Sequence, residues 1–432
     1  MTDNQRINIS PFSGEIDTTF TIPGSKSITN RAFLLAICSS GTSKIYNPLF
    51  SDDTEAGLEA AKALGCRVSQ TDNYIEVEGI GSERPVSNVE VNVRSAGTVA
   101  RFLPCMLAMG RSGTWLLNAS EQMMQRPMKG LFDALAGLGP CVETRGEEDR
   151  YPITVHGELI QSDETFVDGS ISSQYLSGLL LGSPQYKTAL TFRTNGNIVQ
   201  RQYVDITLDC MRAFGAQVDD ASDLSVIKVE PTGYAGTDFH VEADASTATY
   251  FSALPAALGG TVLIDNLARN SRQPDIRFLE ILEAMGCVVE WDDNGHVRIT
   301  RPSGLTKLKG GHSFDLNDCS DAALTVAALA PLADGPIEIS GVAHIRNHEC
   351  DRVDAMTHAL TRMGIKVEER QDGWKIYPGE ARFAELETRD DHRMAMALTV
   401  LGLAQNGVSL DYPNCVAKTC PKFFEMISDV RT

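Results

Sequence analysis

The chain has 432 residues, with 38 Lys and Arg against 57 Asp and Glu, which gives a formal net charge of −19. This balance argues against a nucleic-acid binder or a binder of anionic membranes, because both need clustered positive charge. With 42% hydrophobic and 22% charged residues, the composition is that of an ordinary folded protein and not of a disordered or fibrous one.

No segment of the sequence has the pattern of a targeting or membrane-spanning element. Residues 1–10 lack the charged and then apolar layout of a secretory signal, and the longest apolar run, residues 394–404, is shorter than the roughly 18 residues that a membrane span needs. The 10 cysteines are scattered without a CxxC pair, a spacing that suggests neither a disulfide framework nor a zinc site. We therefore expect a cytoplasmic protein with reduced thiols and no metal.

One pattern occurs five times along the chain. An amphipathic helix ends in an apolar residue and Gly, and a strand, a polar turn and a second strand follow. The closing glycines lie about 75 residues apart, and they are Gly65, Gly139, Gly215, Gly286 and Gly364. A helix commonly ends on a residue in the left-handed conformation, which Gly adopts without a clash of a Cβ atom.

The period of this repeat predicts the architecture. Helices and strands mix within every repeat, which indicates an α/β (mixed α+β) fold, and a period of about 75 divides the chain into close to six units. Chains longer than roughly 250 to 300 residues usually split into domains. We therefore expect two domains of three units each with a cleft between them. The alternative is a single solenoid, although solenoid repeats are normally shorter than this.

Four segments place hydroxyl or basic side chains at the start of an expected helix. Residues 23–31 have the sequence Pro-Gly-Ser-Lys-Ser-Ile-Thr-Asn-Arg, and residues 95–101, 170–174 and 390–393 have the same design. The free N–H groups and the positive dipole end of a helix start attract anions, and Lys or Arg adds full charge. One such start alone is more often a plain N-cap, but four in one acidic chain favour a ligand with phosphate groups.

Basic side chains recur in these helix starts and in the expected loops. The set comprises Lys26, Arg31, Arg101, Arg126, Arg352, Arg393 and Lys418. If they converge, the ligand carries several negative charges. Two acidic residues accompany them: Glu349, spaced i,i+3 from Arg352, and Asp321. By themselves these could be a solvated ion pair at a helix start and a helix cap.

Taken in order, these motifs resemble the EPSP synthase family (5-enolpyruvylshikimate-3-phosphate synthase, 3-phosphoshikimate 1-carboxyvinyltransferase). The resemblance extends over essentially the whole chain. The matching segments are residues 23–27 with Asn30 and Arg31, residues 96–98, 126–127, 172–174 and 244–246, Glu349 with Asp351 and Arg352, and residues 391–395 and 417–419.

The resemblance implies a fold and a reaction. The fold has two domains, each of three βαβαββ units around a pseudo-threefold axis, which close on the substrates. One domain would comprise residues 1–23 and 243–432, and the other residues 24–242. The family transfers the carboxyvinyl group of phosphoenolpyruvate to the 5-hydroxyl of shikimate 3-phosphate and releases phosphate, in the shikimate pathway to chorismate and aromatic amino acids. It needs no cofactor, and we expect a monomer with no nucleic-acid or membrane partner.

The resemblance also implies site residues. Asp321 would take the proton from the 5-hydroxyl and Glu349 would protonate C3 of phosphoenolpyruvate, with Lys26 and His392 assisting. Shikimate 3-phosphate would be bound by Lys26, Ser27, Arg31, Ser172, Ser173, Gln174, Tyr203, Asp321, His344 and His348. Phosphoenolpyruvate would be bound by Lys26, Gly97, Arg126, Gln174, Arg352, Arg393 and Lys418.

Some positions depart from the family pattern. Gln200 stands where many members have a Ser, His344 and His348 stand where many have Asn and Lys, and Phe102 replaces a frequent Pro. The histidines are neutral or partly charged near pH 7.

Two other functions remain open. A UDP-N-acetylglucosamine enolpyruvyl transferase shares the fold, but it uses a loop with a reactive Cys, and residues 120–127 contain none. Its opening motif is Ala-Lys-Asn, whereas this chain has Ser-Lys-Ser. A non-catalytic scaffold of the same repeat would not need Asp321 and Glu349 beside the basic side chains.

Overall fold

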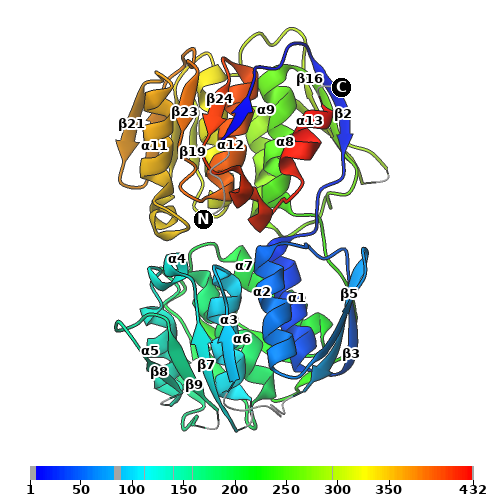
Figure 1. The fold of residues 1–432 in the computed structure, drawn as a ribbon, viewed down its shortest axis with the longest axis vertical. Helices are drawn as coiled ribbons and strands as arrows, with labels where there is room; N and C mark the ends of the chain where they lie inside the picture. The colour runs from blue at the N-terminus through cyan, green and yellow to red at the C-terminus, as the bar shows by residue number, and fades with distance from the viewer. Residues whose placement is uncertain are drawn as a thin grey trace. The chain divides into compact units, whose positions relative to one another are not determined.

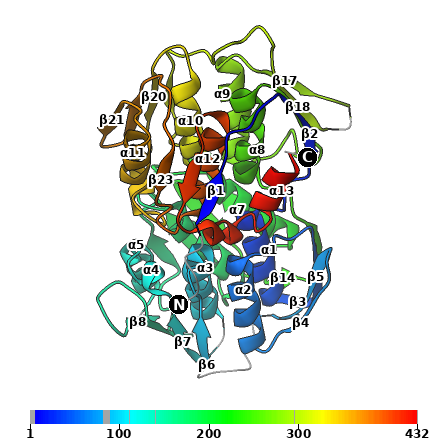
Figure 2. The ribbon, with the colours of Figure 1, turned by 45° about the horizontal axis from the view of Figure 1, so that its top comes forward.

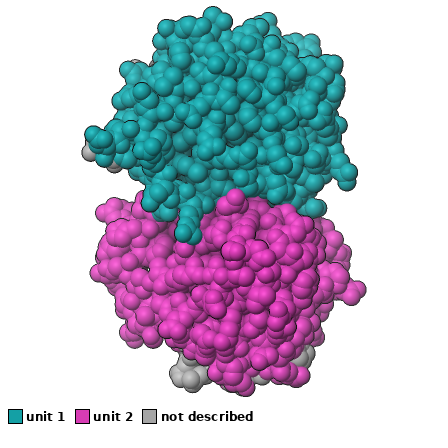
Figure 3. Space-filling view, turned by 180° about the vertical axis from the view of Figure 1, so that it is seen from behind, with its two compact units in different colours: residues 1–23, 242–432 teal, residues 24–241 magenta. Residues whose placement is uncertain are grey.

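The computed structural model describes residues 6–81, 89–110, 112–139, 141–157, 159–293 and 295–430. They form two compact units, shown in teal and magenta in Figure 3. Unit 1 comprises Met1–Pro23 and Glu242–Thr432, and unit 2 comprises Gly24–Val241. None of the helices in the described ranges is long and apolar enough to cross a bilayer.

The described residues of unit 2 form three small sheets of similar topology, in which a parallel strand pair is continued by antiparallel strands (Figure 1). The first has the order β6 (Val89–Asn92), β7 (Thr114–Asn118), β9 (Ile153–His156) and β8 (Val142–Thr144). The second has the order β10 (Glu164–Phe166), β11 (Leu190–Arg193), β13 (Val226–Val229) and β12 (Val218–Asp220). The third combines β14 (Tyr234–Ala235), β15 (Asp238–His240), β3 (Ser39–Tyr46), β5 (Tyr74–Ile80) and β4 (Arg67–Gln70).

The helices of unit 2 form its core. They are α1 (Lys26–Cys38), α2 (Asp52–Ala63), α3 (Gly97–Met109), α4 (Glu121–Met124), α5 (Lys129–Leu138), α6 (Ser173–Gly182) and α7 (Gln202–Ala213). Helices α1, α3 and α6 are apolar on nearly all sides and almost fully buried, as expected of central helices. Gly178 and Gly182 let α6 approach α3 closely, because a Cβ there would lie 2.6 and 2.7 Å from the carbonyl oxygens of Arg101 and Cys105.

Unit 1 repeats this design. Two sheets have the orders β17 (Val288–Trp291), β18 (Val297–Arg301), β16 (Gly260–Ile264), β2 (Ile16–Phe20) and β19 (Ser313–Asp315), β20 (Ile337–Ser340), β22 (Gly373–Ile376), β21 (Val367–Arg370). The helices are α8 (Ala245–Leu258), α9 (Phe278–Ala284), α10 (Ala323–Leu329), α11 (Arg352–Arg362), α12 (His392–Ala404) and α13 (Phe423–Asp429). Helices α8, α10 and α12 pack together in the centre and are almost fully buried.

The third sheet of unit 1 explains why the helix and glycine pattern occurs five times and not six. It contains β23 (Ala384–Leu386) parallel to β24 (Val408–Leu410), and β1 (Ile7–Ile9) supplies the antiparallel strand (Figure 2). The N-terminal strand thus completes the sheet of the last unit. The six units and the mixed α/β fold expected from the sequence are confirmed.

The closing glycines mostly have the expected conformation. Gly65, Gly215, Gly286 and Gly364 have φ values of 93°, 92°, 101° and 85°. For Gly139 the expectation is wrong, because its φ is 161° and its backbone is extended. Gly is needed there for a different reason, since a Cβ would lie 2.1 Å from the carbonyl oxygen of Leu159.

Candidate functional site

The three central helices of unit 2 begin close together. The Nδ2 atom of Asn30 on α1 donates to Oγ1 of Thr98 on α3 at 2.6 Å. Nη1 of Arg101 on α3 donates to Oε1 of Gln174 on α6 at 3.0 Å. These bonds bring three of the predicted anion-binding helix starts to one end of the unit.

Arg31 is a buried cation held by neutral groups. Its side chain is 1% exposed, and it donates to Oγ1 of Thr207 at 2.7 Å, to the carbonyl oxygen of Ser27 at 2.9 Å and to that of Tyr203 at 3.1 Å. None of the ion pairs found in the described ranges includes Arg31, and burial lowers its pKa to about 10. A buried charge without a counter-charge is costly, so an anionic ligand beside Arg31 would relieve that cost.

Two further guanidinium groups lie against the backbone at the start of α3. A Cβ atom on Gly97 would lie 2.7 Å from Nη1 of Arg126 and 2.9 Å from Nη1 of Arg101. The loop that carries Arg126 is held in place because Oη of Tyr175 donates to the carbonyl oxygen of Pro127 at 2.8 Å. Two like charges at a helix N-terminus form a strong anion site.

Replacement of Gly97 by alanine should therefore weaken binding of a small anion without unfolding the protein. The clashing atoms are the ends of flexible arginine side chains, which can move at little cost to folding. We expect the KM for phosphoenolpyruvate, the anion that the sequence resemblance implies for this position, to rise about tenfold, equivalent to about 1.4 kcal/mol, with an unchanged melting temperature. Gly304→Ala is the control, because a Cβ at Gly304 meets open space. An unchanged KM in the Gly97 variant would contradict this account.

The remaining predicted residues of unit 2 lie at helix starts or in the adjoining turns. Lys26 is in the first turn of α1, and its Nζ lies 3.8 Å from Oδ2 of Asp53. Ser172 is the N-cap of α6, where its side chain accepts a bond from the backbone of Gln174, and Ser173 is buried behind it. Gln200 adopts a φ of 49° in the turn before α7, and its carbonyl oxygen accepts a bond from the backbone N of Tyr203 at 3.0 Å.

Unit 1 contains a more strongly charged network, centred on Arg352. This side chain is 1% exposed and meets three carboxylates: Asp391 (Nε to Oδ2, 2.8 Å), Glu349 (Nη2 to Oε2, 2.9 Å) and Asp321 (Nη1 to Oδ1, 3.1 Å). Burial opposes the charge, but these carboxylates outweigh it and raise the pKa of Arg352. Within the described ranges no acidic cluster is arranged to hold a metal ion, and here the guanidinium occupies the centre of the carboxylates.

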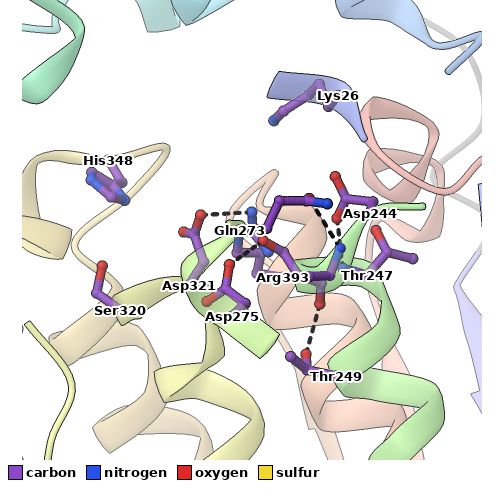
Figure 4. A network of polar contacts seen from close by, with 12 residues as sticks. Lys26, Asp244, Thr247, Thr249, Gln273, Asp275, Ser320, Asp321, His348 and Arg393 are labelled. Atoms are coloured by element: carbon purple, nitrogen blue, oxygen red, sulfur yellow. Dashed lines mark hydrogen bonds and ion pairs between the residues drawn. The ribbon is translucent and has the colours of Figure 1, made fainter. Parts of the chain in front are cut away.

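Asp321 and Glu349 each bridge two cations. Oδ2 of Asp321 accepts a bond from Nη2 of Arg393 at 2.9 Å (Figure 4), in addition to the bond from Arg352. Oε1 of Glu349 lies 3.1 Å from Nζ of Lys418. These two carboxylates thus belong to one network of charge-assisted hydrogen bonds, which are the stronger kind.

The histidines supply hydrogen bonds more than charge. Nδ1 of His348 lies 3.0 Å from Nη1 of Arg352. Because a guanidinium can only donate, this nitrogen is the acceptor of a neutral ring. Nε2 of His344 lies 2.8 Å from Oγ of Ser320, and burial lowers the pKa of His344 below 6.5. The ring of His344 is therefore neutral near pH 7. His392, in the first turn of α12, is 1% exposed.

The sequence did not identify Asp391 as part of this network. Its carboxylate is fully buried, caps α12 through the backbone N of Arg393 and binds Arg352. An Asp before His and Arg signals an N-cap, but nothing local shows that the same carboxylate meets an arginine from another helix.

Comparison with known proteins gives a consistent result. Residues 10–427 match the family model described as EPSP synthase (3-phosphoshikimate 1-carboxyvinyltransferase). The chain is 40% identical to a protein of Halalkalibacterium halodurans named 3-phosphoshikimate 1-carboxyvinyltransferase 2, over 99% of this chain and 95% of that protein. It is 36% identical to the 3-phosphoshikimate 1-carboxyvinyltransferase of Aliivibrio fischeri strain MJ11, over 99% of each. Its fold is similar to EPSP synthase from Acinetobacter baumannii, with a TM-score of 0.81, 24% identity and coverage of 99% and 98% of the two chains.

Proposed function

The chain belongs to the EPSP synthase family, and on this premise we propose that it transfers the carboxyvinyl group of phosphoenolpyruvate to the 5-hydroxyl of shikimate 3-phosphate and releases phosphate. The observation that carries the proposal is the buried network in which Arg352 joins Asp321 and Glu349. It combines cations for an anionic substrate with two carboxylates suited to proton transfer. Both substrates are anions, which accounts for clustered basic side chains in an acidic protein.

Shikimate 3-phosphate binds mainly through residues of unit 2. Arg31 supports this assignment best, because it is buried without a carboxylate partner among the described ion pairs. The other residues of unit 2 come from the starts of α1, α6 and α7, namely Lys26, Ser27, Ser172, Ser173, Gln174 and Tyr203. Asp321, His344 and His348 come from unit 1.

Phosphoenolpyruvate binds through arginines and lysines of both units. Arg126 lies against Gly97 at the start of α3, and Arg352, Arg393 and Lys418 belong to the unit 1 network. Lys26 and Gln174 contact both substrates. The guanidinium fork of an arginine matches carboxylate and phosphate groups bidentately.

The reaction proceeds by addition and elimination. Asp321 takes the proton of the 5-hydroxyl of shikimate 3-phosphate while the hydroxyl oxygen bonds to C2 of phosphoenolpyruvate. At the same time Glu349 gives a proton to C3. The tetrahedral adduct then returns a proton from C3 to Glu349, re-forms the double bond and expels phosphate, which takes the proton that Asp321 holds. Lys26 and His392 assist the proton transfers. Such general acid–base steps typically contribute about 10²- to 10⁴-fold each.

We further propose that the enzyme works in the cytoplasm as a monomer. Analytical ultracentrifugation under assay conditions would give a species of about 47 kDa, and a dimer that persists at assay concentrations would refute the proposal.

Phosphate release tests the function directly. With phosphoenolpyruvate, the purified protein should release phosphate when shikimate 3-phosphate is added and not when UDP-N-acetylglucosamine is added. Release with the second acceptor would identify the other enolpyruvyl transferase. No release with either acceptor would support the scaffold alternative and overturn the proposal.

A further inference from the structure

Asp275 is a buried carboxyl group that the reaction above does not use. It lies in the short 3-10 helix η2 (Pro274–Arg277) and is 2% exposed. Its Oδ2 atom accepts a hydrogen bond from Oγ of Ser246 in the first turn of α8, and its Oδ1 atom has no partner among the described residues (Figure 4). None of the ion pairs found in the described ranges includes Asp275. A carboxylate in such surroundings is costly, and the neutral acid is favoured.

Asp275 nevertheless lies beside the charged network of unit 1. Figure 4 shows it next to Asp321 and Arg393. The titratable or charged groups that face it are Asp321 and Cys319 from the segment before α10, Arg393 from α12 and Asp244 from the N-cap of α8. Burial, and then the negative charge of Asp321, raise the pKa of Asp275 to about 7, although Arg393 and the Ser246 hydroxyl oppose the shift.

We propose that Asp275 is a positioning residue that carries a proton while the enzyme works, so that the Arg393 guanidinium is directed toward Asp321 and the anionic substrate and not toward Asp275. The inference rests on the proposed function, in which Arg393 binds phosphoenolpyruvate. An ionised Asp275 competes for the Arg393 guanidinium, and it adds a negative charge where a negatively charged substrate must bind. Substrate affinity therefore falls as Asp275 loses its proton.

The KM for phosphoenolpyruvate between pH 6 and 8.5 tests this role. Asparagine has the shape of the protonated acid and cannot ionise, so Asp275→Asn should keep near-normal kinetics at pH 6. From pH 6 to 8.5 the KM of the unmodified enzyme should rise about tenfold more than that of the variant. Titration of the substrate and of His344 affects both proteins and cancels in the comparison.

Asp318→Asn is the matched control. Asp318 lies just before the 3-10 helix η3 (Ser320–Ala322), which contains Asp321, but its side chain is 41% exposed and pairs with Arg277. The same change there should leave the pH profile of KM as in the unmodified enzyme. Superimposable profiles for the unmodified enzyme and Asp275→Asn would overturn the proposal.

A stability measurement separates this inference from the proposed function. The unfolded chain loses the Asp275 proton near pH 4, whereas the folded protein keeps it to about pH 7. The folded state therefore loses stability from this group as the pH rises through that window. The melting temperature of Asp275→Asn minus that of the unmodified protein should increase from pH 4.5 to 7 and then level off. If this increase is observed but the protein releases no phosphate, the proposed function is refuted and the protonation of Asp275 is not. If the difference in melting temperature stays constant with pH, the proposal that Asp275 carries a proton is refuted.

Discussion

Replacement of Glu349 by glutamine is expected to lower kcat by about 10³-fold without weakening the binding of phosphoenolpyruvate. The size of the expected decrease in kcat follows from the contribution of a positioned general acid, which is typically about 10²- to 10⁴-fold. Glutamine has nearly the same shape and still offers one acceptor oxygen to Arg352 or Lys418. It removes a negative charge from the network, so an anionic substrate meets a more positive site.

The surroundings of Glu349 in the structure oppose its proposed role as an acid. A carboxylic acid with an ordinary pKa of about 4 is ionised at pH 7. Arg352 at 2.9 Å and Lys418 at 3.1 Å favour the ionised form further. The carboxylate and phosphate of the substrate must therefore draw these two cations away before Glu349 can hold a proton. We therefore expect Glu349 to become a competent acid only when both substrates are bound.

Single-turnover kinetics with both substrates measure the chemical step directly. Glu338→Gln is the matched control, because Glu338 also lies between two cations, Lys375 at 2.8 Å and Arg370 at 3.1 Å, but on the protein surface. This control should react at the normal rate. Near-normal turnover by Glu349→Gln would remove the acid role of Glu349.

The repeat could be predicted from the sequence because each unit marks its own boundary locally. A helix that ends at a glycine such as Gly286 requires only near neighbours, and the spacing of these glycines counts the units. The last unit has no such mark, since its closing strand β1 comes from the opposite end of the chain. The conformation of Gly139 could not be predicted from local sequence either. Its approach to Leu159 is a tertiary contact with no local signal.

The site was predictable to a similar degree. Basic residues at helix starts, such as Arg31 and Arg393, stand out in an acidic chain. Their partners do not, because a buried carboxylate at a helix start has the same local sequence as an exposed cap. Asp391 and Asp275 acquire their roles only when α12 and η2 pack against α8 and the elements around Arg352.

Replacement of Arg352 by methionine should destabilise the folded protein by about 3 to 5 kcal/mol, because it leaves Asp321, Glu349 and Asp391 buried around an uncharged side chain. In a unit of this size the melting temperature should fall by about 10 °C. Lowering the pH should reduce the difference in melting temperature between Arg352→Met and the unmodified protein, because protonated carboxyl groups no longer repel one another.

Arg370→Met is the control, because Arg370 is 41% exposed and its pair with Glu338 lies on the surface, where such pairs contribute about 0 to 1 kcal/mol. Thermal unfolding of the three proteins between pH 4.5 and 8 checks the expectation. If Arg352→Met melts within about 2 °C of the unmodified protein at pH 8, other cations neutralise the three carboxylates. In that case Arg352 does not provide the expected stabilisation.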